Sequence, residues 1–246
     1  MVFWIAAGLA AFFLGLSKGG LPVIALLAVP IMALFMDPAM AAGLLLPLYI
    51  VADVYAVYLF RRAYSVRNLK ILIPSALIGV IVGYFSVSHV PGDAVKLLLA
   101  GIGIFYLATS MARRLSQTER PPAPADVPRG IFWGACAGLT SYIAHAGGPP
   151  YQVYVLPQKL DKMTFLGTTT ILFTSINLMK VPPYILAEQI TFSSMGQSVW
   201  LAPMAIFGAW SGSRVVRLLP EKLFYYLIEA TLGLVSLKLL YEVIFS

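Results

Sequence analysis

Charged residues are scarce in this sequence, and their scarcity determines its class. Asp, Glu, Lys and Arg make up 11% of the 246 residues, whereas a globular domain carries about 25%. Hydrophobic residues account for 60% of the chain, and its mean hydropathy is +0.86. So little polar surface cannot coat a particle in water, and the coat must therefore be lipid. We predict a polytopic integral membrane protein.

Cysteine, histidine and acidic residues are also few, which argues against several kinds of chemistry. The single cysteine, Cys136, permits no internal disulfide and does not provide for a cysteine-based metal cage. The sequence has no paired His-Glu metal motif or acidic dyad, and no Walker P-loop. We expect neither an enzyme nor a cofactor or metal site. The net charge of +7 is attributed to basic cytoplasmic loops, so we expect no nucleic-acid partner.

Long apolar segments predict membrane-spanning helices. A helix needs about 20 residues to cross the hydrocarbon core, and six segments are long enough: 38–60, 71–88, 94–111, 164–180, 193–213 and 223–245. Two pairs of shorter stretches, 2–16 with 21–36 and 130–146 with 149–157, each surround a glycine-rich break. Each pair is either a re-entrant hairpin or two spanning helices. We favour hairpins, because segment 149–157 is too short to span.

Basic residues then predict the orientation. If each long segment crosses and each pair returns to its own side, one side collects Arg61, Arg62, Arg67, Lys70, Arg113, Arg114, Arg120, Arg129, Lys159, Lys162, Arg214, Arg217 and Lys222. The other side keeps only Lys96, Lys180 and Lys238, at or inside helix ends. The first side is therefore cytoplasmic. We expect a multi-pass protein of the cell inner membrane with both termini outside.

The two halves of the chain repeat one pattern of glycine and proline. Three ordered sets recur: Pro74, Gly79, Gly83 and Pro91 as Pro203, Gly208, Gly212 and Pro220; Gly19, Gly20 and Pro22 as Gly147, Gly148 and Pro150; Gly43 and Asp53 as Gly167 and Asn177. A cytoplasmic linker at 113–129 separates the halves, 1–112 and 130–246. Each half makes an odd net number of crossings, so one is inverted relative to the other.

This repeat predicts the fold class. We expect an all-α polytopic membrane protein of two inverted repeats, each a broken or re-entrant helix pair plus three transmembrane helices. Inverted repeats with broken helices are typical of secondary transporters, whose sites lie near the bilayer midplane.

The glycine-rich breaks are the candidate substrate site. Non-helical backbone at membrane depth survives only where protein buries it or where water or substrate reaches it. Helices that start after Gly20 and Gly148 would direct free N–H groups and positive dipole ends toward an anion. The candidate binding residues are Ser17, Lys18, Gly19, Gly20, His145, Gly147, Gly148, Tyr151 and Gln152. For Lys18 the alternative is snorkelling or a short loop, and for His145 it is a neutral, hydrogen-bonded interior residue.

Polar residues on two matching helices are the candidate pathway. Asp53 lies inside segment 38–60, where an ionised carboxylate is costly unless it is protonated, paired or reached by water. It is either a proton-carrying or gating group, or an acid that bonds a neighbouring helix. Thr170, Thr174 and Asn177 follow at i, i+4 and i+7, which places them on one helix face. This stripe lines a path or serves interhelical hydrogen bonding.

Three motifs stand out: Gly-Leu-Ser-Lys-Gly-Gly-Leu-Pro at 15–22, Gly-Gly-Pro-Pro at 147–150 and Phe-Leu-Gly-Thr-Thr-Thr…Asn at 165–177. Together they resemble the TauE/SafE family, the sulfite exporter or toluene-sulfonate uptake permeases. The resemblance implies a secondary transporter of sulfur-containing anions such as sulfite, sulfoacetate or other organosulfonates. The parts of this chain to which the resemblance applies are the two glycine-rich segments and the helices that follow them.

We therefore expect a secondary transporter of a small anion, with protons as a candidate coupling ion carried by Asp53. The expected partners are that anion and the lipid bilayer. An anion channel is the alternative, and saturable counterflow rather than ohmic current would separate the two. The anion, the direction of transport and the oligomeric state are left open by the sequence.

Overall fold

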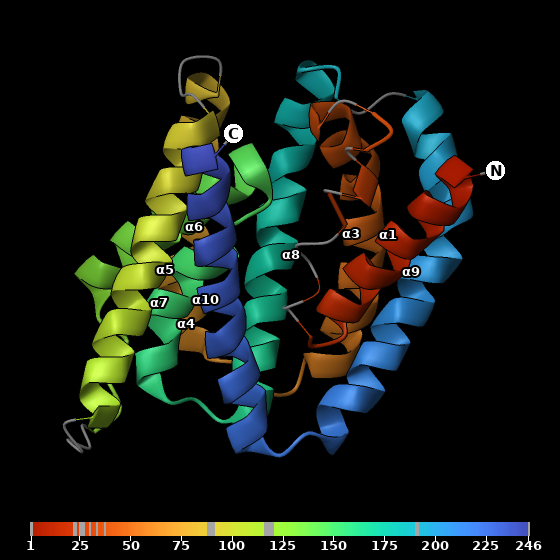
Figure 1. Cartoon of the computed structure of the whole chain (residues 1–246). Helices are drawn as coiled ribbons and strands as arrows, with labels where there is room; N and C mark the ends of the chain where they lie inside the picture. Colours follow the sequence, from red (N-terminus) through yellow and green to blue (C-terminus); the bar gives the residue numbers. More distant parts are fainter. Residues whose placement is uncertain are drawn as a thin grey trace. The chain divides into compact units, whose positions relative to one another are not determined.

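The computed structural model describes residues 2–21, 24, 28–29, 31–32, 34–36, 38–87, 92–115, 121–189 and 192–245. Within these residues the chain forms helices and no strands (Figure 1). The elements are α1 (Val2–Lys18), α3 (Pro38–Phe60), α4 (Val66–Ser86), α5 (Gly92–Leu115), α6 (Val127–Ala144), α7 (Gly148–Val155), the 3-10 helix η2 (Leu156–Gln158), α8 (Lys162–Leu186), α9 (Phe192–Leu218) and α10 (Glu221–Phe245). Each predicted apolar segment coincides with a helix, except that much of 21–36 lies outside the described residues.

Several of these helices are long and apolar enough for a membrane. Within the described residues, three qualify as spans by length and composition: Met40–Phe60, Val66–Ser86 and Glu221–Ile244. Large apolar side chains also point outward, with Trp200 80% and Leu218 84% exposed. Exposed apolar groups of this size suit lipid rather than water. These helices agree with the predicted membrane protein.

The helices extend beyond the apolar segments where polar residues suit the helix termini. Helix α4 begins five residues before segment 71–88, because the Ser65 side chain accepts a hydrogen bond from the Asn68 N–H and caps the helix. Helix α8 continues six residues beyond segment 164–180 and contains Pro182 and Pro183 near its end. A charged residue such as Lys180 therefore ends the apolar segment without ending the helix.

The described helices form two compact units. Unit 1 comprises Met1–Tyr64 and Leu166–Phe224, and so contains α1, α3, most of α8 and α9. Unit 2 comprises Ser65–Phe165 and Tyr225–Ser246, and contains α4, α5, α6, α7, η2 and most of α10. Each unit takes helices from both sequence halves. The predicted division into repeats on either side of 113–129 concerns sequence similarity and stays a prediction.

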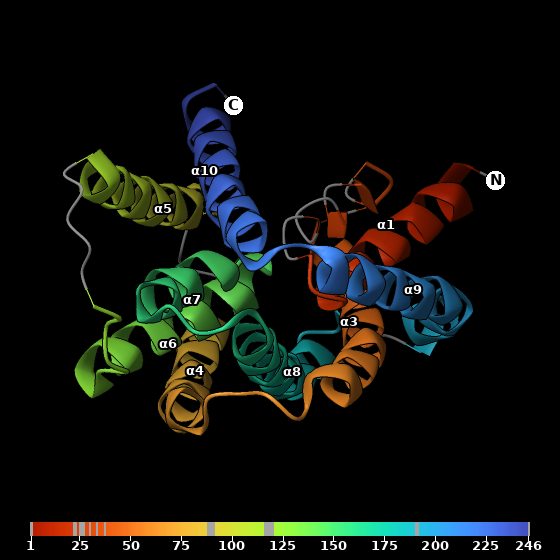
Figure 2. The ribbon, with the colours of Figure 1, turned by 90° about the horizontal axis from the view of Figure 1, so that it is seen from below.

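In unit 1, α1 packs against α9 at glycines (Figure 2). A Cβ on Gly15 would overlap the backbone carbonyl of Ala205, and one on Gly208 would overlap that of Phe12. Only the absence of side chains allows the two backbones to approach this closely. Around this contact lies a core of small and aliphatic residues, including Ala7, Ala10, Ala11 and Leu14.

In unit 2, α4 packs against α6 in the same way. A Cβ on Gly79 would overlap the Ala135 carbonyl, and one on Gly138 would overlap that of Ala76. Ala76 and Gly79 become Ala205 and Gly208 at the repeat spacing of 129. The repeated glycines therefore serve close helix packing in both units.

The packing partners of α9 and α4, which are α1 and α6, correspond at a different residue offset from that of the glycine-rich breaks. Phe12 and Gly15 in α1 correspond by contact to Ala135 and Gly138 in α6, which is a spacing of 123 rather than 128. The second half therefore has five more residues between this contact and its Gly-Gly pair. By packing register, Lys18 corresponds to Ser141.

Candidate functional site

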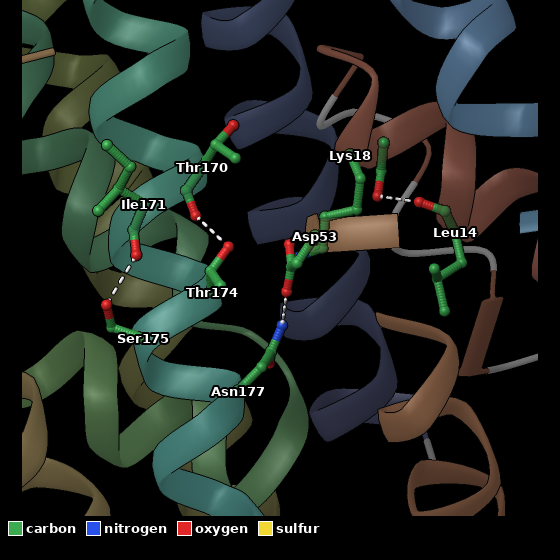
Figure 3. Close-up of polar contacts among 9 residues, drawn as sticks. Leu14, Lys18, Asp53, Thr170, Ile171, Thr174, Ser175 and Asn177 are labelled. Atoms are coloured by element: carbon green, nitrogen blue, oxygen red, sulfur yellow. Dashed lines mark hydrogen bonds and ion pairs between the residues drawn. The ribbon is translucent and has the colours of Figure 1, made fainter. Parts of the chain in front are cut away.

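Unit 1 buries an ion pair between α1 and α3 and joins it to α8 (Figure 3). The Lys18 Nζ lies 2.7 Å from Oδ1 of Asp53. The Asn177 Nδ2 donates a hydrogen bond of 2.6 Å to Oδ2 of the same carboxylate. The Asp53 side chain is 0% exposed and that of Lys18 is 13% exposed. The sequence analysis expected Asp53 to be protonated, paired or reached by water, and in the structure it is paired.

The end of α1 places Lys18 at this site. Lys18 is the last residue of the helix, and Gly20 adopts a φ of +114°, a backbone conformation that glycine tolerates and other residues rarely adopt. An ammonium group in the last turn is stabilised by the negative end of the helix dipole. The Ser17 hydroxyl donates to the Leu14 carbonyl, 2.6 Å away, and Gly19 packs against the backbone of α9. Lys18 therefore turns inward to a carboxylate instead of snorkelling to the surface.

Tyr49 forms a second contact for Lys18 on α3, one turn before Asp53. The Lys18 Nζ lies 5.1 Å from the centroid of the Tyr49 ring, within cation–π range. Tyr49 is buried, with 6% of its surface exposed. The ammonium therefore has both an acid and an aromatic face as neighbours.

Lys180 is a second lysine in this region, and sequence reasoning did not select it as a site residue. That reasoning counted it among external lysines at helix ends, whereas the structure buries it completely. It follows Asn177 by three residues and so lies on the same face of α8. Its Nζ lies 5.9 Å from the centroid of the Tyr184 ring. The i, i+3 spacing from Asn177 was the signal that could have found it.

Three ionisable residues of unit 1 lie on α1, α3 and α8: Lys18, Asp53 and Lys180. Within the described residues, Asp53 and Lys180 are the only members of the Asp, Glu, Lys and Arg types in the buried class. Two opposite charges 4 Å apart attract by about 4 kcal/mol at an effective dielectric constant near 20. This group, which we call the charged cluster (Lys18, Asp53, Asn177 and Lys180), can therefore attract an anion.

The predicted threonine stripe continues along α8 toward the charged cluster (Figure 3). The Thr174 hydroxyl donates to the Thr170 carbonyl at 2.7 Å, and the Ser175 hydroxyl donates to that of Ile171 at 2.9 Å. These donors are engaged within their own helix, although the oxygens can still accept hydrogen bonds. Of the stripe, Asn177 makes the interhelical hydrogen bond that the sequence analysis considered.

The second glycine-rich break lies in unit 2, between α6 and α7. His145 ends α6 in a left-handed conformation with a φ of 49°, and its backbone N–H bonds the carbonyls of Ser141 and Thr140. Helix α7 begins at Gly148, directly after Gly147, as the sequence predicts. His145 therefore forms the turn that leads into the second glycine pair.

The donors at the start of α7 are fewer than we expected. Pro149 and Pro150 occupy its first turn, and proline has no N–H. The Tyr151 N–H bonds the Gly147 carbonyl at 3.4 Å. The helix dipole remains, but the expected array of free N–H groups after Gly148 is not available here.

The side chains of α7 supply polar groups instead. Gln152 is 8% exposed, and its Oε1 is buried without a hydrogen-bond partner among the described residues. Its Nε2 lies 3.9 Å from the position that a Cβ on Gly148 would take, so the amide lies against the first turn of the helix. Tyr151 is buried, with its ring 5.8 Å from that of Phe165.

The family model for the sulfite exporter TauE/SafE matches residues 4–239 of the chain. The chain belongs to this family. The match confirms the resemblance inferred from the motifs at 15–22, 147–150 and 165–177. Searches of curated proteins and of solved structures found no match.

Membership of the TauE/SafE family settles the general class of the protein. It is a membrane protein of a family that transports sulfur-containing anions, and the family is one of transporters rather than enzymes. The charged cluster of unit 1 and the break between α6 and α7 are both inside the matched region.

Proposed function

We propose that this TauE/SafE protein is a secondary transporter that moves a small sulfur-containing anion across the cell inner membrane by alternating access. Sulfite, sulfoacetate and other organosulfonates are the substrate candidates. The observation that carries the proposal is the charged cluster, in which the ammonium of Lys18 is held against the buried carboxylate of Asp53. An intramembrane ionisable group is a functional candidate by default, because its burial is costly.

Lys18 is the primary binding group in this proposal. Its ammonium already holds one oxyanion, the carboxylate of Asp53, at 2.7 Å. A sulfonate presents similar negatively charged oxygens and can form an ion pair with the same ammonium. The incoming anion would therefore compete with Asp53 for Lys18, which gives Asp53 the role of a gating group and of the candidate carrier of a coupling proton.

The α3 and α8 helices support the inverted-repeat architecture. A Cβ on Gly43 would overlap the carbonyl of Gln189, just after α8, and one on Gly167 would overlap that of Ala63, just after α3. The two helices therefore run antiparallel. Gly43 and Gly167 are repeat equivalents, and so are Asp53 and its partner Asn177. Antiparallel contact between equivalent helices is the arrangement that two inverted repeats would produce.

The break between α6 and α7 is the proposed contribution of the second half. Gln152 presents a buried amide at the first turn of α7, and the positive end of that helix dipole favours an anion. We assign Gly147, Gly148, Tyr151 and His145 to this candidate region of unit 2.

Uptake of radiolabelled sulfite into proteoliposomes tests the proposal. Lys18→Ala should lower uptake about tenfold or more, because a hydrogen bond to a charged group contributes about 1.5–3 kcal/mol and 1.4 kcal/mol is tenfold. The double variant Lys18→Ala/Asp53→Asn removes both members of the pair and should remain inactive. Lys238→Ala is the control, because Lys238 is 55% exposed and pairs with Glu242.

Two outcomes would overturn this proposal. Unchanged uptake in Lys18→Ala would remove the charged cluster as the binding site. Ohmic current without saturation or counterflow in the wild-type protein would make it an anion channel.

A further inference from the structure

Helix α9 of unit 1 carries an exposed apolar stripe that ends in two arginines. Met204, Phe207 and Trp210 are all exposed, and their spacing of three residues places them on one face of the helix. Arg214 and Arg217 follow at a spacing of four and three residues, and both are exposed as well. This face of α9 is therefore apolar along its length and positively charged at its C-terminal end.

Trp210 holds the guanidinium of Arg214 in place. The Cζ of Arg214 lies 5.2 Å from the centroid of the Trp210 ring, within cation–π range. The Trp210 ring is itself stacked on that of Phe207, with 5.9 Å between their centroids. Because the guanidinium uses its flat face for this contact, the N–H donors along its edge remain directed outward, where they can bind an oxyanion.

The two arginines have no counter-ion within the described part of the chain. Neither Arg214 nor Arg217 forms an ion pair with a carboxylate there. The exposed lysines of unit 2 differ in this respect, because Lys96 pairs with Asp93 and Lys238 pairs with Glu242. The positive charge at the end of α9 is therefore available to an external anion.

A second pair of the same kind lies at the same level on α3. The Cζ of Arg61, just after this helix, lies 4.6 Å from the centroid of the Tyr58 ring. Helices α3 and α9 run in the same direction (Figure 1) and are joined near their starts, where the Ser198 hydroxyl donates to the Leu44 carbonyl at 2.8 Å.

The level of these arginines follows from their distance along the helices. Arg61 follows Leu44 by 17 residues. Arg214 follows Ser198 by 16, so both arginines lie about 25 Å from the Ser198–Leu44 bond at about 1.5 Å per residue. The hydrocarbon core of a bilayer is about 30 Å thick. Arginines stacked on aromatic rings at one level are typical of the interface between lipid and water.

We propose that Trp210, Arg214 and Arg217, which we call the arginine site, bind the headgroup of an anionic phospholipid. The two guanidinium groups hold its phosphate, and an acyl chain lies along Met204 and Phe207. Arginine suits a phosphate because its planar N–H fork forms paired hydrogen bonds. The apolar stripe favours a lipid over a free phosphate, and the excess positive charge favours an anionic lipid over a zwitterionic one. This inference goes beyond the proposed transport and does not depend on it.

Fluorescence quenching of Trp210 by brominated lipids tests the proposal. The variant Trp4→Phe/Trp133→Phe/Trp200→Phe leaves Trp210 as the only tryptophan. It is reconstituted in phosphatidylcholine vesicles that contain a fixed fraction of either dibrominated phosphatidylglycerol or dibrominated phosphatidylcholine. Phosphatidylglycerol should bind beside Trp210 at least about fivefold more tightly. A chain that keeps only Trp200, near the opposite end of α9, should show no such preference.

Substitutions then test the two arginines. Arg214→Gln/Arg217→Gln should reduce the preference for phosphatidylglycerol at Trp210 to a ratio near one. Lys96→Gln/Lys238→Gln is the matched control, because it removes the same charge from two lysines that already have acidic partners, and it should leave the preference unchanged. Excess sn-glycerol 3-phosphate, a soluble headgroup without acyl chains, should not reduce the quenching.

Each outcome decides the inference. Equal quenching of Trp210 by the two brominated lipids overturns it, as does a preference that survives loss of both arginines or is lost equally in the lysine control. Competition by sn-glycerol 3-phosphate would assign the site to a free phosphate and overturn the lipid assignment. Native mass spectrometry of the unaltered chain with the two lipids repeats the first comparison without any substitution, so a variant that fails to fold does not prevent a decision.

Discussion

Within each unit the helices pack in the same way, but the two units bury different kinds of polar side chain. The α1–α9 contact in unit 1 and the α4–α6 contact in unit 2 both depend on glycines set against backbone carbonyls. Unit 1 buries an ion pair and a second lysine. Unit 2 buries a reciprocal pair of amides, in which Asn68 donates to Gln158 at 2.8 Å and Gln158 donates back at 3.2 Å.

The two sets of buried polar groups differ in what it costs to bury them. Two amides that satisfy each other cost little to bury, because each donor meets an acceptor of the same kind. Charges are more costly to bury, and a buried ion pair is often no more stable than apolar residues of similar volume. Stability alone therefore gives little reason to bury the charged cluster of unit 1, whereas the proposed anion binding would give one. The amide pair of unit 2 is explained by helix packing alone.

The largest predicted effect comes from breaking the ion pair of unit 1. Lys18→Met leaves the Asp53 carboxylate buried without its ammonium partner, which should lower the free energy of unfolding by about 3–5 kcal/mol. The double variant Lys18→Met/Asp53→Asn removes both charges and should recover most of this loss. Thermal unfolding in detergent is the measurement. A double variant no more stable than Lys18→Met would contradict the assignment of an energetically coupled pair.

The helices of both units could be predicted from the sequence, because hydropathy and glycine spacing are local signals. Segment 38–60 coincides with α3, and Gly148 begins α7 as expected. The assignment of helices to units could not be predicted. Unit 1 joins α1 and α3 to α8 and α9 from the other half of the sequence, and such pairing depends on contacts far apart in the chain.

The charged cluster was only partly predictable. Lys18, Asp53 and Asn177 stood out because polar residues are rare in apolar segments, but nothing local paired them. Lys180 was not selected, because it was counted only among lysines at or inside helix ends. Its burial depends on the continuation of α8 to Leu186, which hydropathy does not reveal.

Replacing a closely packed glycine by alanine should destabilise the protein to the same extent in the two units. Gly15→Ala in unit 1 and Gly138→Ala in unit 2 each place a Cβ against a backbone carbonyl that cannot move aside. Each should lower the free energy of unfolding by about 1–3 kcal/mol, as overpacked cores do. Gly8→Ala is the matched control on α1, because nothing lies within 4 Å of its Cβ position. A large loss in one unit only would show that the packing is not shared.

The amide pair of unit 2 should affect stability without affecting transport. Asn68→Ala removes both hydrogen bonds to Gln158, and an unsatisfied buried polar group costs about 1–3 kcal/mol. We expect the lower end of this range, because the Gln158 Nε2 also donates to the Tyr154 carbonyl at 3.2 Å. Sulfite uptake per folded protein should remain at the wild-type level. A tenfold loss of uptake at unchanged folded fraction would mean that the amide pair itself takes part in transport.

The smallest effect concerns an exposed carboxylate of unit 2, the counterpart to the buried Asp53. Asp161 precedes α8, and its Oδ1 accepts a hydrogen bond of 3.0 Å from the Thr164 N–H. Hydrogen bonds from the Thr164 side chain and backbone N–H lower the pKa of Asp161. Asp161→Ala should therefore cost about 1 kcal/mol at neutral pH, as the loss of a helix cap does.

The pH dependence of this loss distinguishes a cap from a structural defect. Because the pKa of Asp161 is lower in the folded protein, its contribution is complete above the unfolded value of about 3.9 and is lost as the pH falls through the folded value. The unfolding curves of Asp161→Ala and wild-type protein should thus converge in acid. A difference that persists there would mean that the side chain stabilises α8 by something other than its charge.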